Sequence, residues 1–376
     1  MKVGLIAPPW VAVPPPEYGG TELIVDVLAR GLAAAGHDVV LFATGDSTCP
    51  VPIRFHLDRA LGTASATLVA ESSHVVEAYR ALADCDVVHD HSLLGALYGP
   101  ALVDVPVVAT AHGPFVEDLQ RLFSAIAARA AIVAISHHQR STAPALAVEA
   151  VIHHGIDVER MPLGAGRGGY ALFLGRMSPD KGVDRAIVAC RAAGVPLVIA
   201  AKMWEPEEVA YFETVVQPLL HDGAEFVGQV GGEAKTELIG GASCLINPIR
   251  WAEPFGLVMV EALACGTPVV AFREGAAPEI VDHGSTGFIV DDEVSMVAAL
   301  EAVAGLERSR CRTSAMARFS SARMVGDHVA LYERLIDRTR PVRRTKPGWG
   351  ATARPLVPAV SVDVDQRLII GTLGVG

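Results

Sequence analysis

Short apolar runs alternate with amphipathic stretches along most of this chain. Stretches such as 21–35, 72–83 and 184–193 repeat apolar residues at helical spacing. Between them lie short, continuous apolar runs, at 2–7, 38–43, 87–89, 105–111 and 131–135 and then at 170–174, 196–201, 244–247, 268–271 and 286–290. Continuous runs of this kind are typical of parallel strands buried on both faces, so the pattern predicts an α/β protein.

A Gly-rich segment, residues 161–169, separates the two series of strands and has no periodic apolar pattern. We therefore expect two doubly wound, Rossmann-like domains, at residues 1–160 and 165–319. A last amphipathic helix is predicted from 319 to 335, or about 320–338 with its flanks. The pattern dissolves after Pro341, and residues 341–376 are expected to be a tail of unknown structure, either disordered or adding a short strand.

The composition of the 376 residues, 51% hydrophobic and 19% charged, excludes global disorder and allows sizeable cores. We find no apolar run of membrane-spanning length, and the first residues resemble a buried strand rather than a signal peptide. Six scattered cysteines without a C-x-x-C pair predict reduced core thiols in a cytoplasmic protein rather than disulfides or a zinc site.

The net charge of −11 is unevenly distributed. Residues 1–160 carry 9 Lys and Arg against 17 Asp and Glu, while residues 321–376 carry 9 against 5. This distribution lacks the basic surface of a nucleic-acid binder, and an acidic first half disfavours a stable membrane anchor on anionic lipid. The oligomeric state cannot be inferred from the sequence.

Two glutamates, Glu253 and Glu261, bracket an apolar run at 254–260. Ionised side chains are rarely buried without partners, so such a pair needs cationic neighbours or a ligand rich in hydroxyls. If the chain is helical from Val258, Glu253 lies on the preceding loop, where free backbone N–H groups face an incoming anion. The alternative is an acidic helix cap and an ordinary surface glutamate.

Two further loops precede helices. Arg176 and Lys181 lie between a predicted strand and helix, where their two cations suit a diphosphate; the alternative is a surface loop with Arg176 paired to a carboxylate. Adjacent Gly19 and Gly20 let backbone approach an anion, although a plain turn with Thr21 as the helix cap explains them equally well.

Three histidines, His89, His91 and His112, end successive strands of the first half. Zinc ligation by His89, Asp90 and His91 is conceivable, but alternate residues of a strand point to opposite faces. Core or cleft-lining histidines with satisfied hydrogen bonds are the favoured interpretation, and no metal site is predicted.

Taken in order, these motifs resemble glycosyltransferase family 4, retaining enzymes of the GT-B fold, over roughly residues 1–338. The motifs that carry the resemblance are Gly19-Gly20-Thr21-Glu22, Val87-Val88-His89-Asp90-His91, His112-Gly113, Ala134-Ile135-Ser136, Gly175-Arg176, Lys181-Gly182, the segment from Glu253 to Glu261, the run from Ala264 to Ala271 and the segment from Glu279 through Phe288. The resemblance implies two domains facing across a cleft, with the final helix packed back on the first domain.

The resemblance also implies roles for individual residues. Arg176 and Lys181 would hold the donor diphosphate, Glu261 the ribose and Glu253 the transferred sugar. The further residues implied at the donor are His112 near the reacting carbon, Gly19 and Gly20 against the diphosphate, and the backbone of Phe255, Gly256, Leu257 and Val258.

An acceptor would dock on first-domain loops, where Trp10, Tyr18 and Phe115 could stack on it or could pack the loops instead. Two departures from the family pattern stand out. His154 replaces the common Asn before Gly155, and Lys202 is either a third donor-site cation or a solvent-facing residue.

We therefore expect a cytoplasmic, metal-independent hexosyltransferase without a cofactor. It would use a nucleotide-diphosphate sugar, UDP before GDP, and a small-molecule, glycan or natural-product acceptor. Two alternatives stay open: a nucleotide-sugar epimerase on the same fold, and a non-catalytic protein that binds nucleotide sugars.

Overall fold

The computed structural model describes residues 1–17, 19–62, 67–221 and 223–339, which form one unit containing two parallel sheets. The predicted tail at 341–376 and Tyr18 lie outside the described residues. None of the described helices is long and apolar enough to cross a membrane.

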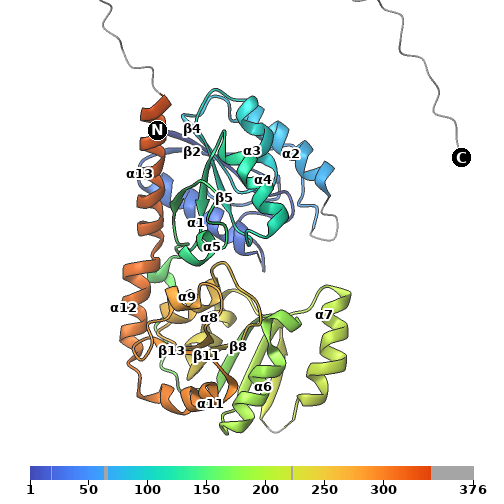
Figure 1. Ribbon diagram of the computed structural model, residues 1–376, viewed down its shortest axis with the longest axis vertical. Helices are drawn as coiled ribbons and strands as arrows, with labels where there is room; N and C mark the ends of the chain where they lie inside the picture. Colours follow the sequence, from blue (N-terminus) through green and yellow to red (C-terminus); the bar gives the residue numbers. More distant parts are fainter. Residues whose placement is uncertain (18, 63–66, 222, 340–376) are drawn as a thin grey trace, which may run out of the picture. The chain divides into compact units, whose positions relative to one another are not determined.

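The first sheet has seven parallel strands in the order β3-β2-β1-β4-β5-β6-β7 (Figure 1). Its strands are β1 (Lys2–Ile6), β2 (Asp38–Ala43), β3 (Ile53–Phe55), β4 (Val87–Asp90), β5 (Val107–Ala111), β6 (Ala131–Ala134) and β7 (Val148–Val151). The helices of this half are α1 (Gly20–Ala34), α2 (Leu68–Ala81), α3 (Gly95–Tyr98), α4 (Glu117–Ala127) and α5 (His137–Ser141).

Both faces of this sheet are covered, because alternate residues of each strand enter different cores. Val3, Leu5 and Leu41 pack with α1, whereas Ile6 and Phe42 pack on the other face with α2 and α4. The strands therefore read as continuous apolar runs, as the sequence indicates.

The second sheet has six parallel strands in the order β10-β9-β8-β11-β12-β13. These strands are β8 (Ala171–Arg176), β9 (Leu197–Lys202), β10 (Ala224–Gly228), β11 (Cys244–Asn247), β12 (Val269–Phe272) and β13 (Gly287–Val290). The helices are α6 (Val183–Ala192), α7 (Pro206–Tyr211), α8 (Gly232–Gly241), α9 (Leu257–Ala264), α10 (Ala277–Ile280), α11 (Glu293–Ala302) and α12 (Arg308–Phe319). The fold class is confirmed: two Rossmann-like α/β halves.

The last helix lies where the sequence predicts it, at about 320–338 with its flanks, and it ends a few residues beyond 335. α12 ends at Phe319, and α13 runs from Ser321 to Thr339. Between them Ile156 donates its N–H to the Phe319 carbonyl and accepts from the Ser321 N–H, which redirects the chain. α13 then packs beside α1 of the first half, with Val325 and Leu331 in the shared core (Figure 1).

All six cysteines are buried and free, which confirms their prediction as core thiols.

Candidate active site

The loop after β8 carries the two predicted cations. Arg176 is 38% exposed and pairs with Asp180, with 3.0 Å between Nη2 and Oδ2. Lys181 is more enclosed, at 12% exposure, and lies 5.2 Å from the centre of the Trp251 ring. Gly182 follows at φ 72°, where a Cβ would lie 2.2 Å from the Pro248 carbonyl oxygen, so this turn requires glycine.

Glu253 lies at the start of the second predicted motif and pairs with Lys181. The distance from Lys181 Nζ to Glu253 Oε1 is 2.5 Å, and Glu253 is 15% exposed. The other carboxylate oxygen, Oε2, is buried and has no hydrogen-bond partner among the described residues. The same holds for Ser178 Oγ and Trp251 Nε1, so polar atoms able to bind a hydroxyl-rich ligand gather around Lys181.

α9 begins directly after this carboxylate. Gly256 precedes the helix at φ 100°, and a Cβ there would come within 3.7 Å of Glu253 Oε2 and 2.5 Å of Met259 Cε. The first N–H groups of the eight-residue helix lack intrahelical acceptors, so Leu257 and Val258 present free donors at its start, directly after Phe255 and Gly256.

Glu261 lies inside α9 and is 7% exposed. Its Oε1 accepts a hydrogen bond of 2.7 Å from Nζ of Lys235, which projects from α8. Of the two expected kinds of partner, cationic neighbours or a hydroxyl-rich ligand, the structure shows a cationic neighbour for each glutamate. Lys235 was not anticipated, since 26 residues separate it from Glu261 and no local pattern connects them.

The first half reaches this site through the start of α1. A Cβ at Gly20 would lie 3.6 Å from Leu257 Cδ1, which places Gly20 against the N-terminus of α9. Thr21 is not the helix cap, because α1 begins at Gly20 and Gly19 occupies the cap position. Beside it Glu22 is buried, and burial raises the pKa of its carboxyl to about 7.

Five buried or half-buried side chains, which we call the histidine cluster, lie between the first sheet, the following linker and α13. Its members are His89, His91, His112, His154 and His328. Burial lowers the pKa of each imidazole, to about 4 for His112 and His328. The cluster is therefore neutral at physiological pH.

The hydrogen bonds of the strand-end histidines favour the core and cleft interpretation over zinc ligation. His89 is hydrogen-bonded to the Tyr332 hydroxyl and the Thr110 hydroxyl, at 2.7 Å each. Asp90 accepts from the Tyr79 hydroxyl, and burial raises the pKa of its carboxyl to about 6.

His112 and His154 together form a chain of contacts from the first sheet to the loop before α9. One ring nitrogen of His112 is 2.9 Å from a ring nitrogen of His91, and the His112 ring stacks on His154 at 5.1 Å between centroids. His154 in turn meets the Phe255 ring edge-on at 5.1 Å. His154, the departure from the family pattern, thus fills the space between His112 and the loop before α9.

A cleft of about 400 Å³ opens at the carboxyl ends of the first-half strands. Trp10, Glu71, Ser92 and His112 line it, so it combines an apolar surface with hydrogen-bonding groups. Phe115 is 2% exposed and packs edge-to-face on Phe123, so it fills the core instead of offering a stacking surface.

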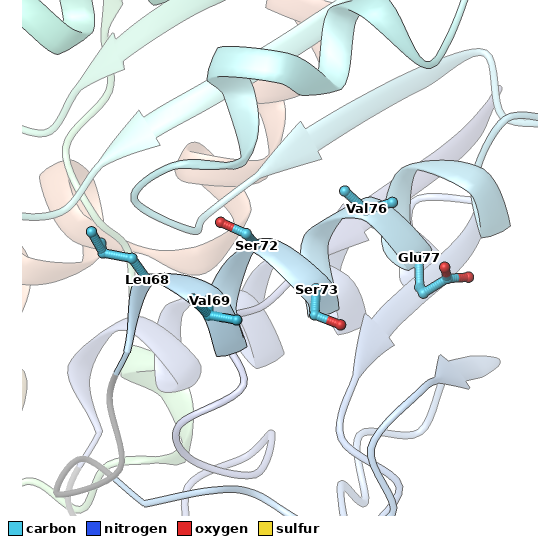
Figure 2. Close-up of a pocket in the computed structure, with 6 residues that line it drawn as sticks. All are labelled: Leu68, Val69, Ser72, Ser73, Val76 and Glu77. Atoms are coloured by element: carbon cyan, nitrogen blue, oxygen red, sulfur yellow. The ribbon is translucent and has the colours of Figure 1, made fainter. Parts of the chain in front are cut away.

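A second hollow, of about 450 Å³, follows one face of α2 (Figure 2). Leu68, Val69, Ser72, Ser73, Val76 and Glu77 line it. The described residues that line it all come from successive turns of one helix, so we do not assign it a role in catalysis.

Lys202 does not face solvent, contrary to one of the two alternatives. It is 8% exposed, its Nζ is 3.4 Å from Glu208 Oε1, and it lies 4.4 Å from the Trp204 ring centre. It ends β9, and Arg176 ends the neighbouring β8 in the same register.

Two family models and several known proteins match this chain. Residues 18–160 match the family model of Glycosyltransferase Family 4, and residues 161–322 match that of Glycosyl transferases group 1. The chain is 31% identical over 347 residues to the alpha-maltose-1-phosphate synthase of Mycobacterium tuberculosis, covering 78% of this chain and 87% of that protein. It is 29% identical over 330 residues to a phosphatidyl-myo-inositol mannosyltransferase of Propionibacterium freudenreichii, covering 76% and 81%.

Solved structures share the fold. AviGT4, a glycosyltransferase involved in avilamycin A biosynthesis, superimposes with a TM-score of 0.68 at 27% identity, covering 89% of this chain and 98% of that one. Sucrose-phosphate synthase from Thermosynechococcus elongatus gives a TM-score of 0.73 at 22% identity, covering 90% and 99%. The chain therefore belongs to the family 4 glycosyltransferases and has their GT-B fold.

Proposed function

We propose that this glycosyltransferase moves a hexosyl unit from a nucleotide-diphosphate sugar to an acceptor hydroxyl, with retention and without a metal ion. The observation that carries the proposal is the pair of Lys–Glu contacts at α9: Lys181–Glu253 just before the helix and Lys235–Glu261 within it. Glu253, paired with Lys181, lies just before the N-terminus of α9, where Gly20 meets Leu257, and Glu261, paired with Lys235, lies within the same helix.

An arriving diphosphate would compete with the carboxylates for these cations. Arg176 and Lys181 would bind its oxygens together with the N–H groups at the start of α9. Glu253, released from Lys181, would accept hydrogen bonds from the sugar hydroxyls, and its unpartnered Oε2 supports this role. Glu261, near Lys235, would accept from the ribose.

Transfer would proceed by same-face displacement. The bond between the anomeric carbon and the diphosphate oxygen breaks, the bond to the acceptor oxygen forms, and the acceptor proton passes to the departing phosphate oxygen. Arg176, Lys181 and the helix N-terminus would stabilise the charge that builds on the leaving group, the role that a metal ion fills elsewhere. His112 is neutral and lines the first-half cleft, so we place it beside the reacting carbon.

UDP is the proposed nucleotide, followed by GDP. Anabaena HepE, a protein of the same fold, has been solved in complex with UDP and with UDP-glucose. The acceptor, a small molecule, glycan or natural product, would enter the cleft lined by Trp10 and His112.

Thermal melting in the presence of UDP, GDP, UDP-sugars and GDP-sugars tests which nucleotide the protein binds. A ligand at 100 times its dissociation constant adds about 2.7 kcal/mol to the free energy of unfolding, and we expect this shift with UDP-sugars. Lys235→Met should weaken it, whereas an Arg310→Met control on the exposed Arg310–Glu307 pair should not. Equal shifts in both variants, or no shift with any nucleotide, would contradict the proposed site.

A further inference from the structure

A second group of chemically active side chains lies away from the Lys–Glu contacts. His137, His153 and Glu279 each offer a ligand atom, and these atoms all lie within 4.8 Å of one another. His137 begins α5 after β6, His153 follows β7, and Glu279 belongs to α10 of the second half. Three distant segments of the chain therefore converge here.

The Glu279 carboxylate is fixed by hydrogen bonds from the first half. It accepts the backbone N–H groups of His137 at 2.8 Å and His138 at 2.6 Å, and it is 2.8 Å from His153 Nε2. Burial acts to raise the pKa of Glu279, but these hydrogen bonds outweigh it and lower the pKa, which keeps the carboxylate ionised. Its orientation is thus set before any ligand arrives.

Two imidazoles and one carboxylate form a recurrent ligand set for Zn²⁺ and related ions. In a tetrahedral site with bonds of about 2.0–2.1 Å, ligand atoms lie about 3.3 Å apart. His153 and Glu279 are already closer than this, at 2.8 Å. His137 is exposed, so rotation of its side chain can bring its ring nitrogen nearer. The backbone N–H groups on Glu279 act as the outer hydrogen bonds that orient metal ligands in such sites.

We propose that His137, His153 and Glu279 form a binding site for a divalent transition metal of the Zn²⁺ class, which ties the two halves together. On binding, the ion takes the place of the hydrogen bond between His153 Nε2 and Glu279, the proton of the neutral imidazole is transferred through solvent from Nε2 to Nδ1, and the backbone hydrogen bonds to Glu279 remain. Solvent water completes the coordination, since His137 is exposed and Glu279 and His153 are 19% and 22% exposed.

The site lies next to the loop before α9. The His153 ring is 5.8 Å from the Phe255 ring, and its neighbour His154 contacts the same phenylalanine. A bound ion would therefore hold the His153 ring in place beside Phe255. The proposed metal site does not depend on the proposed transfer chemistry, because metal binding is measurable without any sugar substrate.

Tag-free protein freed of metal with EDTA, then titrated calorimetrically with ZnCl₂, tests the proposal. We expect one equivalent to bind and the melting temperature to rise, while MgCl₂ has no effect, because imidazole suits Zn²⁺ better than Mg²⁺. His137→Ala should weaken Zn²⁺ binding at least about tenfold, and its exposed position leaves folding intact. His56→Ala, which also removes an exposed histidine, is the matched control and should bind like the parent.

Co²⁺ substitution gives a second readout, since the visible absorption of bound Co²⁺ reports nitrogen ligation. We expect absorption in the parent that His137→Ala and Glu279→Gln lose and His56→Ala keeps. The proposal is overturned if His137→Ala binds Zn²⁺ as tightly as the parent, or if the parent binds none.

Discussion

Replacing Lys181 by methionine tests two contributions of its ion pair with Glu253: one to the stability of the fold and one to turnover. Lys181 and Glu253 are 12% and 15% exposed and 2.5 Å apart. Removing one partner of a fully buried pair costs about 3–5 kcal/mol, because the remaining charge is left in a poorly hydrated place. Here partial exposure and the nearby N-terminus of α9 reduce this to about 2 kcal/mol of unfolding free energy.

The same change removes a cation from the proposed leaving-group site. Loss of one preorganised electrostatic donor lowers kcat by about 10²–10³, or about 3–4 kcal/mol of transition-state stabilisation. The double variant Lys181→Met/Glu253→Gln removes both charges, so we expect most of the lost stability to return while turnover stays low. The parent, the two single variants Lys181→Met and Glu253→Gln, and the double variant form a double-mutant cycle. Urea unfolding gives the stability of each protein, and turnover at saturating donor gives its kcat.

Arg310→Met is the matched control, since its pair with Glu307 is 62% and 64% exposed and should contribute less than about 0.5 kcal/mol. The reasoning is refuted if Lys181→Met retains parental turnover. It also fails if the double variant is no more stable than the single one, because Glu253 would then not depend on Lys181.

Three further outcomes follow from the site. Glu261→Gln removes the charge partner of Lys235, and we expect a raised donor KM with little change in kcat; a fall in kcat alone would contradict a binding role. Gly20→Val should cut turnover at least about tenfold without lowering the melting temperature, because its methyl groups reach the start of α9, while Gly20→Ala stays near the parent; equal activity of both would show that the close approach is unimportant. Unfolding free energy should fall as pH drops from about 6.5 towards 4, since the histidine cluster, with lowered pKa values, takes up protons only on unfolding. Glu22 and Asp90, whose pKa values are raised, act in the opposite direction but are fewer, so urea midpoints at pH 5 equal to those at pH 7 would contradict this balance.

The sequence predicts every interior strand of both sheets but only one of the four edge strands, β13 (Gly287–Val290). All ten predicted strands correspond to observed strands, whereas β3, β7 and β10 were missed. These three lie at sheet edges, where one side is partly exposed, so their residues are mixed and lack a continuous apolar run. Glu225 within β10 and Glu149 within β7 illustrate the interruption.

Some residues of the candidate site could likewise be predicted from the sequence, and others could not. The loops carrying Arg176, Lys181 and Glu253 could be recognised because each joins a strand to a helix within a few residues. The pairing of Lys235 with Glu261, and of His153 with Glu279, depends on segments brought together only by the tertiary fold. No local pattern in the sequence encodes those contacts.

The anomeric configuration of the product is the most direct test of the central claim. The protein is incubated with an α-linked UDP-sugar and a panel of acceptors, and the new linkage is followed by proton NMR from the first turnover, beside a control with donor alone. Retention predicts an α-linked product whose formation matches UDP release and disappears in Lys181→Met. A β-linked first product, or a changed sugar formed from donor alone, would contradict the account.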